Sequence, residues 1–510
     1  MPRPITTRIL LCAFCILLSS CSPQAPTPPL VSTATPLPPP TDISPTNPSL
    51  PTETPTAVAT IQPDFEHPQY VLDLQLDYST KAASVKEIIT YPNWTGETLN
   101  DLVLAVEPNL WSGGFSLKSL SINNQPIANY TLENLSQRLE IPLPQPLPPS
   151  GTVTITINYG LILPQMQAYS NPNEVRPQIY GYSDRQVNFV DWYPFVVPYI
   201  PGQGWLLHNP WFYGEHLVYD LADFDVTVTF TDGANPQIAA SGAEVKPLLS
   251  DVTPTGVVNH HFLLEAGRTF ALSISDFFKV AMQTVGDVTV YSYYFGIYDK
   301  PGEAMLQTTI EAMQTYSERF GPYRHKTLTA VQGDFNDGME FSGLYFISRD
   351  YFNLYDGTPK NYLITIAAHE TAHQWWFDAV ANDQALEPWL DEALATYSER
   401  IYYESVHPDL VDWWWGYRYF EFLEAGYVDT QIYDGGGQRP YWDKVYLTGA
   451  RFLEDLRQRV GDEIFFAFLK DYYTQYTGKR ATGVDFFRVF HEHTATDITD
   501  LMAKYFKNPY

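Results

Sequence analysis

The sequence predicts a multidomain α+β protein in which an N-terminal antiparallel β-sandwich precedes a mixed α/β domain. Apolar and polar residues alternate in short segments broken by Asn, Gly and Pro, as in half-buried strands. Three such segments are 70–78, 152–159 and 224–230. Beyond about residue 284 the pattern becomes helical, for example in 303–319 and in 447–460, where Gly461 is a plausible stop. We therefore place the β-sandwich at 65–283 and the α/β domain at 284–510.

Residues 1–20 have the layout of a secretory signal peptide. Arg3 and Arg8 precede a short apolar core that ends at Leu18, too short for an ordinary membrane span. The sequence Leu18-Ser-Ser-Cys21 resembles a bacterial lipobox, in which Cys21 is lipidated and becomes the new N-terminus. The alternative is an ordinary signal peptide with an incidental cysteine. We expect a lipoprotein, held outside the cytoplasm on a bacterial membrane through Cys21.

Residues 21–64 are dominated by Pro, Thr and Ser and carry almost no charge. Such chain is extended and semi-rigid, and it cannot bury a core. We expect a disordered stalk between the membrane anchor and the folded part.

The whole chain is acidic, with 30 basic and 58 acidic residues and a net charge of −28. Nucleic-acid binding requires basic surface that displaces counterions, so the composition argues against a nucleic-acid partner.

The three cysteines all lie at or before Cys21, so a mature chain that begins there has no disulfide available.

The segment His369-Glu370-Thr-Ala-His373 carries the most specific chemistry in the sequence. Residues four apart lie on one face of a helix, so the two imidazoles can bind one metal ion. The surrounding stretch 362–376 has neither Gly nor Pro and is apolar enough to form a buried helix. Glu370 points about 100° away from His369 and need not be a ligand.

Glu392 is the expected third ligand, early on a second helix for which Pro388 suits the first turn. Three protein ligands with an open fourth position are typical of catalytic zinc sites, with a nearby carboxylate as general base. The alternative, two hydrogen-bonded core histidines, leaves Glu370 as an unpaired carboxylate on an apolar helix, which is costly. We expect one Zn²⁺ per chain.

With these motifs the chain resembles the zinc aminopeptidases of the aminopeptidase N type, which are gluzincins of peptidase family M1. Four blocks occur in the order of that family: 338–343, 369–376, 389–397 and 444–450. The resemblance implies a thermolysin-like α/β zinc metallopeptidase domain at 284–510. Many relatives continue into a helical domain that caps the active site, and we expect that domain to be absent here.

The resemblance also implies a role for each matched residue. His369, His373 and Glu392 match the zinc ligands, and Glu370 matches the general base. Tyr446 matches the tyrosine that stabilises the oxyanion. In the upstream block, Glu340 matches the carboxylate that binds the free α-amine of the substrate, and the backbone at Gly338 and Met339 would lie along the substrate.

Two departures from the family pattern and two open questions remain. Ala393 replaces a usual Gly, and Phe341-Ser342 replaces the usual residues after the motif glutamate, which leaves the depth of the amine pocket open. Glu399 is either a hydrogen-bond partner of a metal ligand or an ordinary surface acid. The aromatic segment 192–205 either lines the cleft or packs as a loop.

We therefore expect a membrane-tethered zinc aminopeptidase that acts on peptides with a free N-terminus. One alternative is a zinc endopeptidase of the same fold. The other is a non-catalytic peptide-binding lipoprotein.

Overall fold

The computed structural model describes residues 67–167, 178–245, 259–419 and 426–510. The predicted signal peptide, Cys21 and the stalk lie outside these residues, so they stay predictions. All elements described below belong to one contact unit of the chain, Thr60–Tyr510. Within the described ranges, no helix combines the length and the apolar character needed to span a membrane.

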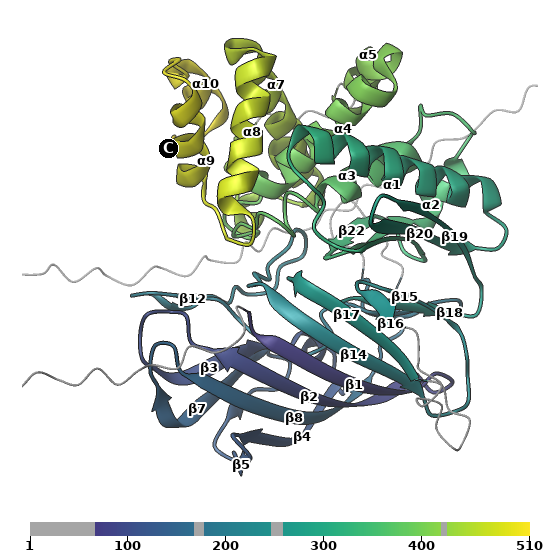
Figure 1. Cartoon of the computed structure of the whole chain (residues 1–510), viewed down its shortest axis with the longest axis vertical. Coiled ribbons are helices and arrows are strands. Elements are labelled where there is room, and N and C mark those ends of the chain that lie inside the picture. Colours follow the sequence, from purple (N-terminus) through teal and green to yellow (C-terminus); the bar gives the residue numbers. More distant parts are fainter. Residues whose placement is uncertain (1–66, 168–177, 246–258, 420–425) are drawn as a thin grey trace, which may run out of the picture. The chain divides into compact units, whose positions relative to one another are not determined.

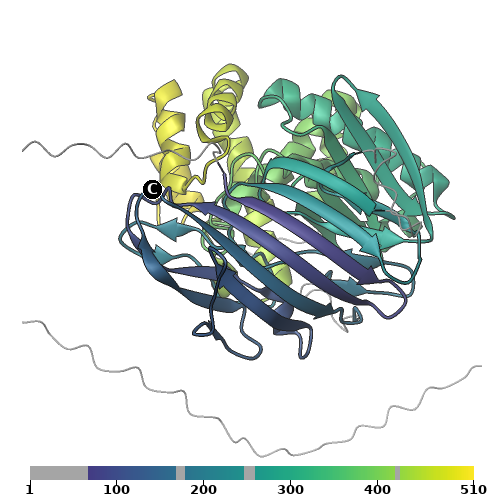
Figure 2. The ribbon, with the colours of Figure 1, turned by 60° about the horizontal axis from the view of Figure 1, so that its bottom comes forward.

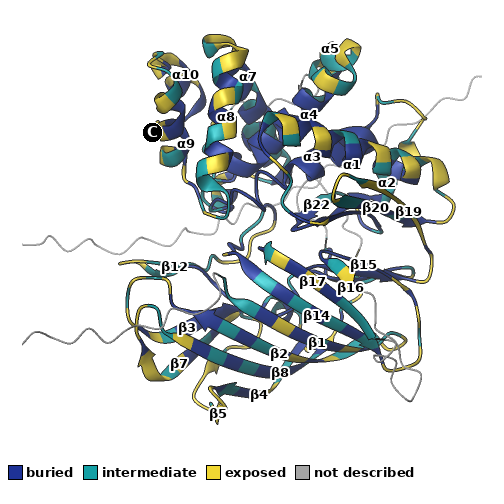
Figure 3. Cartoon of the chain, in the orientation of Figure 1, coloured by how far each residue is buried: buried dark blue, intermediate teal, exposed yellow. Residues whose placement is uncertain are grey.

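The first half of this unit is built on a large eight-stranded sheet, whose strands lie side by side in Figure 2. Its strands, in sheet order, are β16 (Ala243–Val245), β17 (Asn259–Gly267), β14 (Ala222–Phe230), β1 (Gln69–Asp77), β2 (Ala82–Pro92), β8 (Thr152–Ile162), β4 (Phe115–Ile122) and β5 (Gln125–Pro126). Buried and more exposed residues alternate along β1, β8 and β14, as the sequence predicts, and Figure 3 shows the resulting stripes. The pairing is antiparallel except between β1 and β14, which run parallel.

Two four-stranded sheets complete the β part. One has the order β11 (Phe195–Val196), β3 (Leu99–Ala105), β7 (Arg138–Leu147) and β6 (Thr131–Leu132). The other has the order β15 (Gln237–Ala240), β18 (Leu272–Ser275), β10 (Val187–Phe189) and β9 (Gly181–Tyr182). A single buried apolar cluster joins residues of all three sheets, so the core lies between layers, as in a sandwich. A short hairpin of β12 (Tyr199–Ile200) and β13 (Gly204–Trp205) and the 3₁₀ turn η1 (Glu107–Leu110) lie in its connections.

The second half is built on a five-stranded mixed sheet. Its order is β19 (Phe278–Val285), β20 (Val288–Phe295), β21 (Thr327–Gly333), β23 (Leu344–Ser348) and β22 (Gly338–Phe341). The boundary predicted at 283/284 falls inside β19. Strand β22 pairs antiparallel with β23 and forms the edge of the sheet, and this edge strand carries the Gly-Met-Glu motif.

Helices cover this sheet and extend beyond it (Figure 1). Helix α1 (Asp299–Arg319) packs on β20, and α3 (Tyr362–Ala372) packs on β22 and β23. The long α4 (Trp389–Val406) packs on α3 and α7. The remaining helical elements are α2 (Arg349–Leu354), η2 (Pro408–Leu410), α5 (Val411–Trp414), η3 (Trp415–Tyr419), η4 (Ile432–Asp434), α6 (Gln438–Trp442), η5 (Asp443–Thr448), α7 (Gly449–Val460), α8 (Asp462–Tyr476), α9 (Gly483–His493) and α10 (Thr499–Tyr505).

Arg268 joins the β part to the helical part. It is almost completely buried, and its guanidinium donates hydrogen bonds to the backbone carbonyls of Asp378, Ala379 and Lys479. The Asp378 carboxylate lies in the same junction, where it accepts a hydrogen bond from His325 at 2.7 Å. Because these groups are buried, each depends on the others for its hydrogen bonds.

Candidate active site

Helices α3 and α4 bring the three predicted metal ligands together. The Asn361 side chain caps α3 by accepting from the Leu363 amide, and α3 ends at Ala372, four residues before the predicted end. His373 is the C-cap residue and still lies beside His369, because its backbone is helical. Glu392 lies in the first turn of α4. His369 and His373 therefore share one face, as their spacing predicts, although the helix is shorter than the predicted stretch 362–376.

The distances among the ligand atoms match a tetrahedral metal site. The two Nε2 atoms of His369 and His373 are 3.1 Å apart. The Glu392 Oε2 atom lies 3.3 Å from the first and 3.6 Å from the second. Ligands at about 2.0–2.2 Å from a tetrahedral zinc ion are separated by roughly 3.3 Å.

The electrostatics of the cluster also favour a cation. Burial lowers the pKa of His369 to about 4, so its imidazole is neutral and its lone pair is available to a metal. Burial would also lower the pKa of His373, but Glu340, Asp391 and Glu392 outweigh it and raise that pKa well above its ordinary value. Buried carboxylate oxygens of Glu392 and Asp391 have no hydrogen-bond partner within the described ranges. A bound divalent cation would satisfy this excess of buried acceptors.

The general base predicted at Glu370 lies against the edge strand. Its side chain is buried, burial raises its pKa well above the ordinary value, and Oε2 has no hydrogen-bond partner in the described part of the chain. A Cβ atom added at Gly338 would lie only 1.9 Å from Glu370 Oε1. The glycine of the motif is therefore required because the carboxylate occupies the space of a side chain.

Tyr446 approaches the cluster from η5, a π-helical turn between α6 and α7. Its hydroxyl donates a hydrogen bond to Glu392 Oε1 at 2.5 Å, and its ring stacks on His369 with centroids 5.9 Å apart. Tyr446, which the sequence matched through the block 444–450, thus lies within contact of a ligand. The wider π turn places the hydroxyl toward the cluster, and such turns are frequent at functional sites.

Glu340 lies on β22, and a polar network holds it beside the metal cluster. Gln384 Nε2 donates to Glu340 Oε1 at 3.3 Å and to Asp391 Oδ2 at 2.9 Å. Asp391 Oδ1 lies 3.3 Å from His373 Nδ1. Burial raises the pKa of Glu340 to about 8. The carboxylate is thus connected through Gln384 and Asp391 to a ligand histidine.

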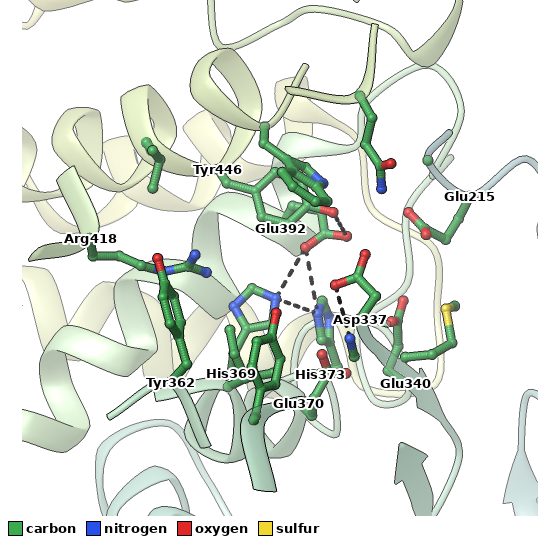
Figure 4. A pocket seen from close by; sticks show the side chains of 18 of the residues that line it. Glu215, Asp337, Glu340, Tyr362, His369, Glu370, His373, Glu392, Arg418 and Tyr446 are labelled. Atoms are coloured by element: carbon green, nitrogen blue, oxygen red, sulfur yellow. Dashed lines mark hydrogen bonds and ion pairs between the residues drawn. The ribbon is translucent and has the colours of Figure 1, made fainter. Parts of the chain in front are cut away.

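A cavity of about 140 Å³ opens onto these groups (Figure 4). Arg418 and Tyr362 lie on one side of the histidines, whereas Glu215, Asp337 and Glu340 lie on the other. Sequence reasoning did not identify Glu215 or Arg418 as site residues. Glu215 comes from the β part, where no motif marks it.

Glu399 is not a surface acid, so that alternative is wrong. It is fully buried and accepts a hydrogen bond from His369 Nδ1 at 2.9 Å. It also accepts hydrogen bonds from Trp414 Nε1 at 2.9 Å and from Arg418 Nε and Nη2 at 3.0 and 2.9 Å. This chain of contacts fixes the ring orientation of His369 and leaves Nε2 directed at the cluster.

The two departures from the family pattern have simple structural consequences. Ala393 packs against Gly449, where an added Cβ would lie 2.4 Å from the Ala393 Cβ, so two small residues let α4 and α7 approach closely. Phe341 is buried and ends β22.

In the segment 192–205, Trp192 is fully buried and donates to the Phe270 carbonyl, and the segment does not line the cavity. It packs as a connection within the β part.

The fold and the site together define a zinc metallopeptidase: a β-sandwich, an α/β domain whose edge strand carries the Gly-Met-Glu motif, and a buried His-His-Glu set with an adjacent carboxylate. Residues 304–505 match the model of the peptidase family M1 domain. The catalytic cofactor of the family is zinc.

Curated relatives and a solved structure are also similar to this chain. Endoplasmic reticulum aminopeptidase 1 of Mus musculus is 28% identical over 280 residues, which cover 50% of this chain and 30% of the relative. Aminopeptidase N of Lactobacillus helveticus is 29% identical over 203 residues, covering 36% and 24%. The chain thus matches less than a third of the length of either. An M1 zinc metallopeptidase from Deinococcus radiodurans shares the fold, with a TM-score of 0.62, 19% identity, and coverage of 86% of this chain and 93% of that one.

Proposed function

We propose that the protein is a zinc-dependent aminopeptidase that removes N-terminal residues from peptides. The observation that carries this proposal is the position of Glu340. One ligand atom each from Glu340, His373, Asp391 and Glu392 lies within 4.8 Å of the others. An α-ammonium group paired with Glu340 therefore places the first peptide bond of the substrate over the metal cluster.

His369, His373 and Glu392 would hold the zinc ion, and their geometry and unpaired acceptors fit it. Bound zinc lowers the pKa of water from about 15.7 toward about 7 and polarises a carbonyl group. Glu370 then accepts the proton of the attacking water and passes it to the leaving amine. Burial raises the pKa of Glu370 above its ordinary value, and a nearby cation would favour its ionised form, which can accept a proton.

Tyr446 acts on the other side of the scissile carbonyl. Its hydroxyl donates to Glu392 Oε1 in this structure, and a small rotation would let it donate to the developing negative charge on the substrate carbonyl oxygen. The edge strand β22, which carries Gly338 and Met339, would lie along an extended peptide substrate.

The test compares substrates with free and blocked amines. We expect wild-type protein to hydrolyse aminoacyl 4-nitroanilides and to leave their N-acetyl derivatives intact. Glu340→Gln should lower kcat/KM for the free-amine substrates by about 100-fold, because a buried charge pair contributes about 2–5 kcal/mol. The endopeptidase alternative predicts cleavage of the blocked substrates, and an unchanged kcat/KM in Glu340→Gln would refute the aminopeptidase proposal.

We also propose that the protein is a lipoprotein, tethered through Cys21 outside the cytoplasm of a bacterial cell. The signal-like segment, the lipobox and the Pro-rich stretch support it. Detergent-phase partitioning of the full chain and of Cys21→Ala tests the tether. The wild-type chain should enter the detergent phase and the variant should not; equal partitioning would refute lipidation.

A further inference from the structure

A second cavity adjoins the active site on the far side of Glu340. Its volume is about 300 Å³, against about 140 Å³ for the cavity at the metal cluster. The two cavities share Gly214, Glu215, Met339 and Glu340 as lining residues. The second cavity therefore has room for several water molecules or for a long side chain.

Aromatic rings from the β part form much of the wall of this cavity. Trp111 and Tyr180 pack with centroids 5.1 Å apart, and Trp211 and Phe212 with centroids 5.3 Å apart. Trp211 and Phe212 are exposed, whereas Tyr180 is buried. The buried Tyr180 hydroxyl has no hydrogen-bond partner in the ranges that the structure describes. The wall thus combines flat apolar surface with an unsatisfied polar atom.

The charged groups around the cavity are mostly acidic. Besides Glu340, the acidic residues Glu107, Asp191 and Glu215 line it, and none of its described lining residues is Lys or Arg. Glu107 Oε2 lies 3.4 Å from His216 Nε2 but makes no hydrogen bond with a described residue. A cleft lined by carboxylates favours cations and repels anions.

We propose that this cavity receives the side chain of the first substrate residue and selects arginine or lysine there. The inference rests on the proposed aminopeptidase function, because it takes Glu340 as the site of the α-amine. From an amine held at Glu340, the side chain on the adjacent carbon extends past Met339 into the second cavity. The methylene stem packs between the aromatic rings, and the cationic end lies among the carboxylates.

The first test compares substrates that differ in charge but not in shape. Arginyl and citrullyl 4-nitroanilides are nearly isosteric, and only arginine is charged. With full-length wild-type protein we expect kcat/KM to be about tenfold higher for arginyl, and higher for arginyl and lysyl than for leucyl. Glutamyl should be the poorest of the series. Equal values for arginyl and citrullyl, or a higher value for leucyl, would overturn the proposal.

A variant assigns the effect to the cavity. Glu107→Gln should lower the arginyl-to-leucyl ratio of kcat/KM by about tenfold, which corresponds to roughly 1.4 kcal/mol. Glu133→Gln is the matched control, because Glu133 is an exposed acid of the same part that lines neither cavity. An unchanged ratio in a folded Glu107→Gln protein would also overturn the proposal. Failure of wild-type protein to cleave any free-amine substrate refutes the aminopeptidase function itself, whereas cleavage without charge preference refutes only the cavity assignment.

Discussion

Replacement of Glu399 by Gln tests how the chain orients its zinc ligand. The Glu399 carboxylate is fully buried and accepts hydrogen bonds from His369, Trp414 and Arg418. Gln has nearly the same shape, but its amide carries one acceptor atom and one donor group. All the groups that face Glu399 are donors, so one of them must face the amide NH₂ in the variant. The Arg418 charge also loses its buried counter-ion.

Two measurable effects follow from this change. Loss of a carboxylate that orients a ligand histidine weakens metal binding by about 10- to 100-fold, or about 1.4–2.7 kcal/mol. Breaking a buried ion pair while leaving the other charge costs about 3–5 kcal/mol. We therefore expect Glu399→Gln to bind zinc at least tenfold more weakly and to lower the free energy of unfolding of the metal-free protein.

Competition with a calibrated chelator measures the zinc dissociation constant, and urea unfolding of the metal-free protein measures stability. Glu463→Gln is the control, because Glu463 is an exposed acid on α8. It should match wild-type protein in both assays. Wild-type zinc affinity in Glu399→Gln would contradict the positioning role, even if the stability falls.

Three further predictions concern the site and the junction beneath it. Gly338→Ala should reduce kcat by more than about 100-fold with little change in zinc content, because its Cβ would collide with the Glu370 carboxylate; a kcat near that of wild-type protein would contradict the close approach. Tyr446→Phe should lower kcat by about 10²–10³-fold and leave KM nearly unchanged, as steady-state kinetics can show, whereas a rise in KM alone would contradict an oxyanion role. Burial would raise the pKa of Asp378, but His325 and Arg324 together outweigh that effect and hold the pKa below its ordinary value. The Asp378 carboxylate therefore contributes stability that is present above about pH 4 and is lost as the pH falls further. Urea unfolding at pH 7 and pH 3 should therefore show a smaller difference between wild-type protein and Asp378→Asn at pH 3, and a constant difference would refute this linkage.

The parts of the fold and site that the sequence predicts well are those set by local periodicity. The alternation along β14 and the helical spacing of His369 and His373 each depend on neighbours within a few residues. Glu392 could be predicted because it lies in the first turn of a recognisable second helix. The exact end of α3 could not, because nothing local stops the helix at Ala372 and tertiary packing decides it.

The residues that the sequence did not reveal act across long separations. Glu215 reaches the site from an irregular connection of the β part, and no spacing rule relates it to Glu340. Arg418 lies in a short π-helical turn, and its role appears only through its contacts with Glu399. The parallel pairing of β1 with β14 is likewise non-local, since alternation is the same in both pairing directions.

We infer that the buried His-His-Glu cluster holds one zinc ion, next to which Glu370 acts as the base for hydrolysis of N-terminal residues. The most direct measurement determines the zinc content and the hydrolysis of an aminoacyl 4-nitroanilide for wild-type protein and Glu370→Gln in parallel. We predict about one zinc per chain in both proteins, and a kcat at least about 10³-fold lower in the variant. A wild-type protein that binds no zinc, or a zinc-loaded Glu370→Gln protein with wild-type kcat, would contradict the account.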